Sequence, residues 1–145
     1  MAIELGLRSL LLSQQSIKSL VPSKKVGERF YDGVFNEFAV QGFAPPYITI
    51  HQIAFDPMKV LGGTTGMERT EIDVDCHSLS HSGAAQLAKA VSDYLKDYSG
   101  NAGSEDYIDS VLWNDKRHDQ VPADTGTDQR RHIISLSLEL FHHAV

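Results

Sequence analysis

The sequence predicts an α+β fold in which a small, mostly antiparallel sheet packs against two helices, with an extended hairpin loop and an acidic arm. Residues 71–77, in the expected strand Glu68–His77, alternate polar and apolar side chains at the two-residue period of a strand. Residues 82–98 repeat apolar side chains every three or four positions, as one face of a helix does. With 145 residues, 41% of them hydrophobic, the chain can fill one core, so we expect a single domain over residues 1–145.

The N-terminal segment predicts an amphipathic helix over Ile3–Gln14. Its apolar side chains fall at helical spacing: Ile3, Leu7, Leu10 and Leu11. A further turn is expected over Ser16–Val21, which Pro22 ends. Three glycines interrupt Ser23–Gly42, so this stretch predicts a short strand plus a loop.

A hairpin is expected in the middle of the chain. Tyr47–Asp56 predicts a strand without a fully polar face, which suits the inside of a sheet or a position beneath a neighbouring subunit. A flexible connection, Met58–Met67, leads to a second strand, Glu68–His77. In that strand Ile72, Val74 and Cys76 share one face, so we expect one buried face and one wet face.

The helix predicted over Ser82–Tyr98 has Ser82 as its N-cap and Gly100 where a helix stop is expected. After it, Ile108–Trp113 predicts a strand. Asn114–Gln129 is acidic and rich in turn residues, and it is either an exposed hairpin or a mobile arm. The last strand is expected over Arg131–Phe141.

The net charge of −6 is unevenly distributed. Residues 1–31 hold five basic residues against two acidic ones, a balance of +3, whereas residues 101–129 hold seven acidic against two basic ones, a balance of −5. Either both are simply solvated surfaces, or the two ends meet across a head-to-tail contact between identical subunits. The candidate residues for that contact are Lys24, Lys25, Arg29, Asp115, Asp119 and Asp124. An acidic chain without a basic stripe is a poor candidate for gripping a phosphate backbone.

No run approaches the roughly 18 apolar residues of a membrane-spanning helix, and charges interrupt any signal-peptide core near Leu10-Leu11-Leu12. We therefore expect a soluble protein that stays in the cytoplasm of the producing cell, with no membrane partner. The single cysteine, Cys76, excludes an internal disulfide and fits a reducing compartment.

Two groups of residues invite a chemical hypothesis. A hard-metal cluster could form from residues at the end of one strand: Asp73, Asp75, His77 and His81. We favour the simpler interpretation of a solvent-facing strand, because such alternation arises whenever one face is wet. Cys76 could be a nucleophile with His51 or His77 as its base, but its apolar strand face favours a small buried hydrophobe.

The glycine-rich segment Gly62–Gly66 lacks the Lys-Ser/Thr ending and helix N-terminus of a phosphate loop, so a hairpin connection is the simpler interpretation. We therefore expect no catalytic site, no metal and no cofactor, and a protein that acts through its surfaces.

The order of elements resembles the tail-completion (tail-terminator) proteins of long-tailed bacteriophages and phage-like particles. The resemblance runs from about Ile3 to Phe141 and rests on three patterned stretches after the leucine-rich N-terminal helix. They are Pro45-Pro46-Tyr47-Ile48-Thr49-Ile50, Glu71-Ile72-Asp73-Val74-Asp75-Cys76 with the following Ala84–Ala88 helix, and Arg131–Leu138.

The resemblance implies an α+β virion protein, assembled in the host cytoplasm, that forms a ring of usually six copies on the tail tube. Such a ring ends tube polymerisation, meets head-side neck or stopper proteins and lets DNA pass through its channel. In that setting the docking candidates are the acidic arm and the loop residues Gly62, Gly63, Thr64, Thr65 and Gly66.

Three other functions are compatible with parts of the sequence. A neck or head-completion protein just above the tail would share most of these features. A small metal-dependent enzyme would use Asp73, Asp75, His77 and His81. A nucleic-acid-binding adaptor is disfavoured by the net charge.

Overall fold

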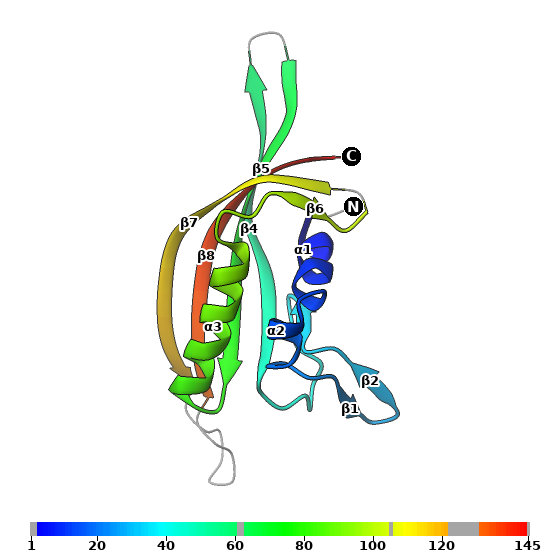
Figure 1. Cartoon of the computed structure of the whole chain (residues 1–145), viewed down its shortest axis with the longest axis vertical. Helices are drawn as coiled ribbons and strands as arrows, with labels where there is room; N and C mark the ends of the chain where they lie inside the picture. Colours follow the sequence, from blue (N-terminus) through cyan, green and yellow to red (C-terminus); the bar gives the residue numbers. More distant parts are fainter. Residues whose placement is uncertain (1–2, 61–62, 105, 122–130, 145) are drawn as a thin grey trace.

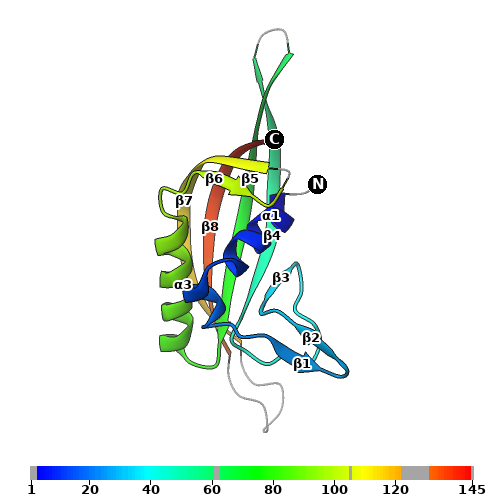
Figure 2. The same ribbon diagram turned by 45° about the vertical axis from the view of Figure 1, so that its right-hand side comes forward.

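A curled six-stranded sheet forms the body of the protein (Figures 1 and 2). The computed structural model describes residues 3–60, 63–104, 106–121 and 131–144. Along the chain the elements are α1 (Ile3–Leu12), α2 (Gln15–Lys18), β1 (Lys24–Val26), β2 (Arg29–Tyr31), β3 (Val34–Asn36), β4 (Tyr47–Val60), β5 (Gly63–Ser78), α3 (His81–Leu95), β6 (Gly100–Ala102), β7 (Asp106–Val121) and β8 (Arg131–Ala144). The sheet order is β3-β4-β5-β8-β7-β6.

Long antiparallel pairs build the sheet. Strand β4 pairs with β5, β5 with β8, and β8 with β7, while the short β3 pairs with β4 in parallel. The predicted α+β class with a small sheet on two helices was therefore wrong. Strands dominate the described residues, the sheet is large, and the three helices there are short. The prediction of mostly antiparallel pairing agrees with the register.

Two segments interpreted as loops are in fact strand, which explains the error in fold class. The expected connection Met58–Met67 instead continues both strands, since Val60 pairs with Gly63. The segment Asn114–Gln129, expected as an exposed hairpin or a mobile arm, continues β7 to Val121, which pairs with Arg131 as the hairpin alternative requires. Residues 122–130 lie outside the described residues. Neither segment has one apolar and one polar face, so the two-residue period of a strand was hidden in the sequence.

One face of the sheet, here called the helix face, is covered by α1 and α3 (Figure 1). Its core combines alternate residues of the strands with the apolar stripes of both helices. Fully buried members include Leu7, Leu11, Ile48, Ile50, Ile72, Leu87, Leu95, Ile108, Leu138 and Leu140. The opposite face, here called the open face, has no helix on it within the described residues.

The long helix begins and ends earlier than expected. Ser80, not Ser82, is the N-cap of α3, and its hydroxyl accepts a hydrogen bond from the Gly83 amide at 3.0 Å. The helix ends at Leu95 rather than Tyr98, because the C-cap Lys96 has an extended ψ of 122°, and Asp97 follows in a left-handed conformation with φ of 57°. Gly100 starts strand β6 instead of stopping the helix directly.

The N-terminal helix packs closely on the sheet edge. Helix α1 ends at Leu12 instead of Gln14, and α2 forms the expected further turn. A Cβ placed on Gly6 would overlap the Ala102 carbonyl, so only glycine permits this approach of α1 to β6. None of the helices in the described part of the chain is long and apolar enough to cross a membrane.

Strands β1 and β2 form a separate two-stranded hairpin, here called the finger (residues 24–31). Its residues Val26 and Tyr31 pack on a second cluster made by Phe35, Phe43 and Tyr47. The three aromatic rings of this cluster meet edge to face, with centroids 5.0 to 6.1 Å apart. The finger is thus held beside β3 and β4, at one flank of the sheet.

Leu87→Ala should destabilise the fold by about 2–5 kcal/mol, because Leu87 is 1% exposed and the substitution leaves a cavity between α3 and the sheet. Urea unfolding followed by circular dichroism measures this. Gln86→Ala, an exposed neighbour on the same helix, is the control and should shift the free energy of unfolding by no more than about 0.5 kcal/mol. Equal effects of the two substitutions would contradict the packing described here.

Candidate interaction surfaces

The open face carries a network of charged side chains across the central strands. Asp73 accepts hydrogen bonds from the Ser137 hydroxyl at 2.7 Å and from Arg117 at 3.1 Å. Arg69 lies 2.8 Å from Glu71 and 3.0 Å from Glu139. These groups come from β5, β7 and β8, and the register of the strands brings them together. The network fixes the side chains that any partner on this face would meet.

Part of the β4–β5 hairpin extends beyond the rest of the sheet (Figure 1). Strand β5 pairs with β8 only from Glu68 to Ser78. Before Glu68, Gly63 and Thr64 pair with Val60 and Lys59 of β4, and residues 65–67 fall in a register shift. From here on, residues 57–67, as far as they are described, are called the arm; this is the end of the β4–β5 hairpin and not the acidic segment Asn114–Gln129. It contains the predicted docking residues Gly63, Thr64, Thr65 and Gly66, now placed in β5, whereas Gly62 lies outside the described residues. An isolated two-stranded hairpin is marginally stable in water, so the arm is suited to contact with a partner.

The base of the arm exposes two large apolar side chains. Ile53 is 57% exposed and Phe55 is 50% exposed. Ile53 stands at a register shift between Gln52 and Ala54, and Phe55 is paired with the buried Thr70. Both side chains face solvent instead of packing in the core. The sequence did not indicate that they form a surface.

The finger presents a basic and aromatic outer face. Lys25 pairs directly with Phe30, on the side opposite to Val26 and Tyr31. Phe30 is 73% exposed, and Lys25 is exposed as well. Arg29 is also exposed, but it pairs with Val26 and so lies on the other side of the finger. Lys24 behaves differently: its ammonium donates to the Ala44 and Pro45 carbonyls at 2.7 and 3.2 Å, and burial lowers its pKa. The Lys24 ammonium is therefore already hydrogen-bonded within its own subunit.

Strand β7 lies on the opposite flank of the molecule from the finger (Figures 1 and 2). Its open face shows Leu112, which is 52% exposed, followed by Asp115 and Asp119. Asp115 and Asp119 are both exposed and were predicted to join a contact between subunits. The third predicted acid, Asp124, lies outside the described residues. The two oppositely charged candidate groups thus lie on separate flanks of one subunit.

The hypothetical metal ligands do not converge. Asp73 bonds Ser137 and Arg117, whereas His77 bonds the Thr49 hydroxyl at 3.0 Å. Asp75 lies 3.3 Å from the His51 ring, and His81 packs against the rings of two other histidines. Within the described residues no three potential ligands are arranged to hold a metal ion.

The Cys76 thiol is buried, and desolvation together with the charge of Asp75 raises its pKa far above its usual range. A neutral buried thiol is a poor nucleophile, so the interpretation of Cys76 as a small hydrophobe agrees with its position. His77 was expected on a wet face but is 8% exposed and stacks on the Tyr47 ring at 4.4 Å. The aromatic cluster beside the finger covers this part of the open face.

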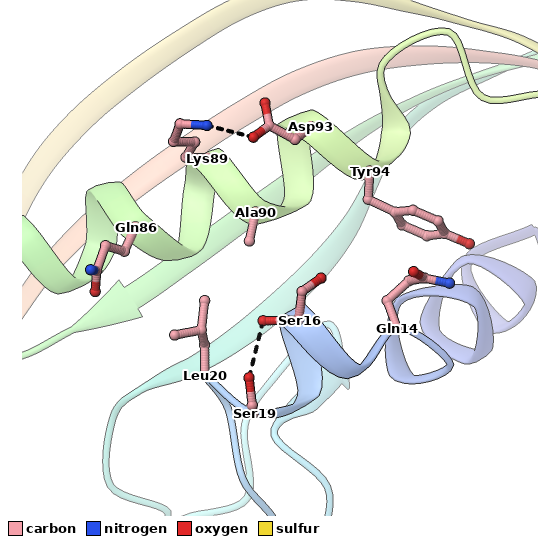
Figure 3. Close-up of a pocket in the computed structure, with 9 residues that line it drawn as sticks. All are labelled: Gln14, Ser16, Ser19, Leu20, Gln86, Lys89, Ala90, Asp93 and Tyr94. Carbon is pink, nitrogen blue, oxygen red and sulfur yellow. Dashed lines mark hydrogen bonds and ion pairs between the residues drawn. The ribbon is translucent and has the colours of Figure 1, made fainter.

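A groove of about 670 Å³ separates α2 from α3 (Figure 3). It is lined by Gln14, Ser16, Ser19, Leu20, Gln86, Lys89, Ala90, Asp93 and Tyr94. Lys89 and Asp93 form an exposed ion pair at 2.6 Å, and Ser19 donates to the Ser16 carbonyl at 3.3 Å. This lining offers amide and hydroxyl groups without a nucleophile paired to a base, so the groove has no catalytic geometry.

Comparison with known proteins identifies the family. The profile of the family described as tail completion protein gp17 matches residues 6–135. The chain belongs to this family. Thirteen chains of solved structures also match, and no curated protein does. One of the matching chains comes from the virion of a native gene transfer agent particle. The alignment covers 97% of this chain and 92% of that one, with a TM-score of 0.56 and 14% sequence identity. This likeness extends to the fold.

Membership of the tail completion protein gp17 family confirms the resemblance inferred from the sequence. It gives the chain a structural, tail-associated role in a phage or phage-like particle. The arm, the finger and the β7 flank each present side chains or backbone beyond the shared core.

His77 should make stability depend on pH. Burial, with the charges of Arg131 and His51, lowers its pKa from 6.5 to about 4. The unfolded chain therefore binds a proton below about pH 6.5 while the folded chain does not, so stability falls between pH 6.5 and 4 by up to about 3 kcal/mol. Urea unfolding of the wild type and of His77→Phe at pH 7 and pH 5 measures this contribution.

The His77→Phe variant should lose less stability than the wild type over that pH interval. His81→Phe, a substitution at an exposed histidine, serves as the control and should follow the wild type. Parallel pH dependence of all three proteins would show that His77 is not held in its neutral form.

Proposed function

We propose that this chain forms a ring, of six copies, that caps the tail tube, ends tube polymerisation and joins the tail to the head-side neck or stopper complex. DNA passes through the ring without specific binding. Its family membership carries this proposal, and the arm is the structural feature that supports it best. The ring, its subunit number and these partners go beyond what the family description states.

The arm is suited to the junction because it reaches beyond the hydrophobic core of its subunit. Its two strands pair only with each other, and its base exposes Ile53 and Phe55. Exposed apolar side chains next to a projecting hairpin are a common form of protein contact surface. We assign the arm to the contact with the tube protein or the neck complex.

Charge supports the remaining parts of the proposal. The predicted contact between copies keeps Lys25, Arg29, Asp115 and Asp119, whereas Lys24 is committed within its own subunit. Because these groups lie on different flanks, a head-to-tail contact repeated around an axis can close into a ring. A net charge of −6 disfavours strong attraction to the phosphates of DNA, which suits passage through a channel.

Deleting the gene in particle-producing cells should give tubes of uncontrolled length that are not joined to heads, and the wild-type gene should restore normal tails. A variant that replaces residues 58–67 by Asn-Gly shortens the arm to a tight turn between Pro57 and Glu68, which already pair. This variant should fold with an unchanged melting temperature but fail to restore tails. Electron microscopy of negatively stained particles measures tube length and joining.

The matched control is the double substitution Thr64→Ser and Thr65→Ser, which keeps the length of the arm and should restore normal tails. Normal tails from the shortened variant would exclude the arm from the junction. Normal tails in the gene deletion would exclude the proposed function itself.

A further inference from the structure

We propose that the finger of one copy docks on the β7 flank of the next copy, with Phe30 covering Leu112 and Lys25 paired with Asp115. This contact rests on the proposed ring and specifies how neighbouring copies meet. The finger and the β7 flank are its two surfaces, and they belong to different sides of the same molecule (Figures 1 and 2).

Apolar complementarity is the first support. Phe30 is 73% exposed on the outer face of the finger, and Leu112 is 52% exposed on the open face of β7. Aromatic side chains that become buried on binding often lie at the centre of a protein–protein interface, with polar groups around them. Each of these two side chains lacks a cover within its own subunit, and each can provide it for the other.

Charge complementarity selects a second copy as the occupant. Lys25 pairs directly with Phe30, so the two side chains lie together on the outer face of the finger. On the other flank Asp115 follows Leu112 by three residues, about 10 Å along a strand, which a lysine side chain next to Phe30 can span. Arg117 lies between Asp115 and Asp119 on this face, but its guanidinium pairs with Asp73 at 3.1 Å, so the two aspartates keep the flank acidic. Lys25 and Arg29, the two exposed cations of the finger, are too few to hold duplex DNA at physiological salt, so a protein surface is the better match.

The contact uses side chains rather than the addition of a strand. Register shifts interrupt β7 between Ile108 and Ser110 and between Trp113 and Asp115. Bulges and charges on an exposed edge oppose pairing with another strand. These obstacles hinder backbone pairing at the edge but not the packing of side chains on the open face of β7. The finger arrives with its outer face already formed, because Val26 and Tyr31 fix its inner face.

Paired cysteines test the contact in assembled particles. Lys25→Cys combined with Asp115→Cys, treated with a short bis-maleimide, should give a ladder of bands at multiples of 16.0 kDa. Each single variant should stay monomeric, because a head-to-tail contact never brings two identical positions together. Cys76 is buried and should not react. Lys25→Cys with Lys96→Cys is the matched control, since Lys96 is exposed at the end of α3. An equal ladder from the control pair, or no ladder from the test pair, would overturn the proposal.

A charge swap tests the same contact without a cross-linker. Lys25→Glu and Asp115→Lys should each lower the amount of the chain in purified particles at least tenfold, and the double variant should restore it. Phe30→Ser should lower it similarly, whereas Leu79→Ser, at another exposed apolar residue, should not. All of these positions are exposed, so the melting temperature should be unchanged.

The outcomes separate this contact from the proposed function. If the wild type is required for normal tails but Lys25→Glu, Asp115→Lys and Phe30→Ser enter particles like the wild type, the contact is wrong and the ring uses other surfaces. If the wild type is absent from particles, the proposed function fails first. Binding of the isolated protein to duplex DNA that is lost in Lys25→Glu, without any ladder, would assign the finger to DNA instead.

Discussion

The apolar layer between the helix face of the sheet and the two longer helices is the constraint on which the rest of the structure depends. It is a single layer, so the long strands of the six-stranded sheet must direct alternate side chains toward it, and Ile72 and Leu138 meet there from neighbouring strands. A shift of one residue in any pairing would turn a whole row of apolar side chains toward solvent. Register is therefore fixed strongly where the helices cover the sheet. Beyond the part of the sheet that the helices cover, two strands can continue only through their backbone pairing, and the arm is such a continuation of β4 and β5.

The polar network on the open face follows from this register. The row that turns away from the core brings Asp73 beside Ser137 and Arg69 beside Glu139. Exposed ion pairs contribute only about 0–1 kcal/mol each, so the network adds little to stability. Its effect is on specificity, because the same charges would be mismatched in another register. A face shaped in this way is polar and well ordered, which suits contact with other proteins.

The helix face could be predicted from the sequence, whereas the extent of the sheet could not. Alternation at Ile72, Val74 and Cys76 correctly marked buried positions, and the stripe through Leu87 correctly marked α3. Strand continuation past Asn114 carries no such alternation, because that part of β7 is exposed on both sides. The single domain stays a prediction. Among the candidate residues, Lys24 and Lys25 are neighbours in β1, so their side chains point to opposite sides of the finger. Lys24 donates a hydrogen bond within its own subunit while Lys25 is exposed, and composition does not reveal which of the two lysines points outward.

The arm and the finger are both two-stranded hairpins, but their support within the subunit differs. The finger rests on an aromatic cluster through Val26 and Tyr31, and a hydrogen bond from Ser23 to Asp32 at 2.7 Å joins the residues that flank it. A surface that is ordered before contact loses little conformational entropy on binding. The arm has no third strand beside it. A preformed element suits a contact repeated identically around a ring, where small errors in angle would prevent closure. An element without internal support suits a partner that supplies the missing surface, which agrees with the role at the junction that we propose for the arm.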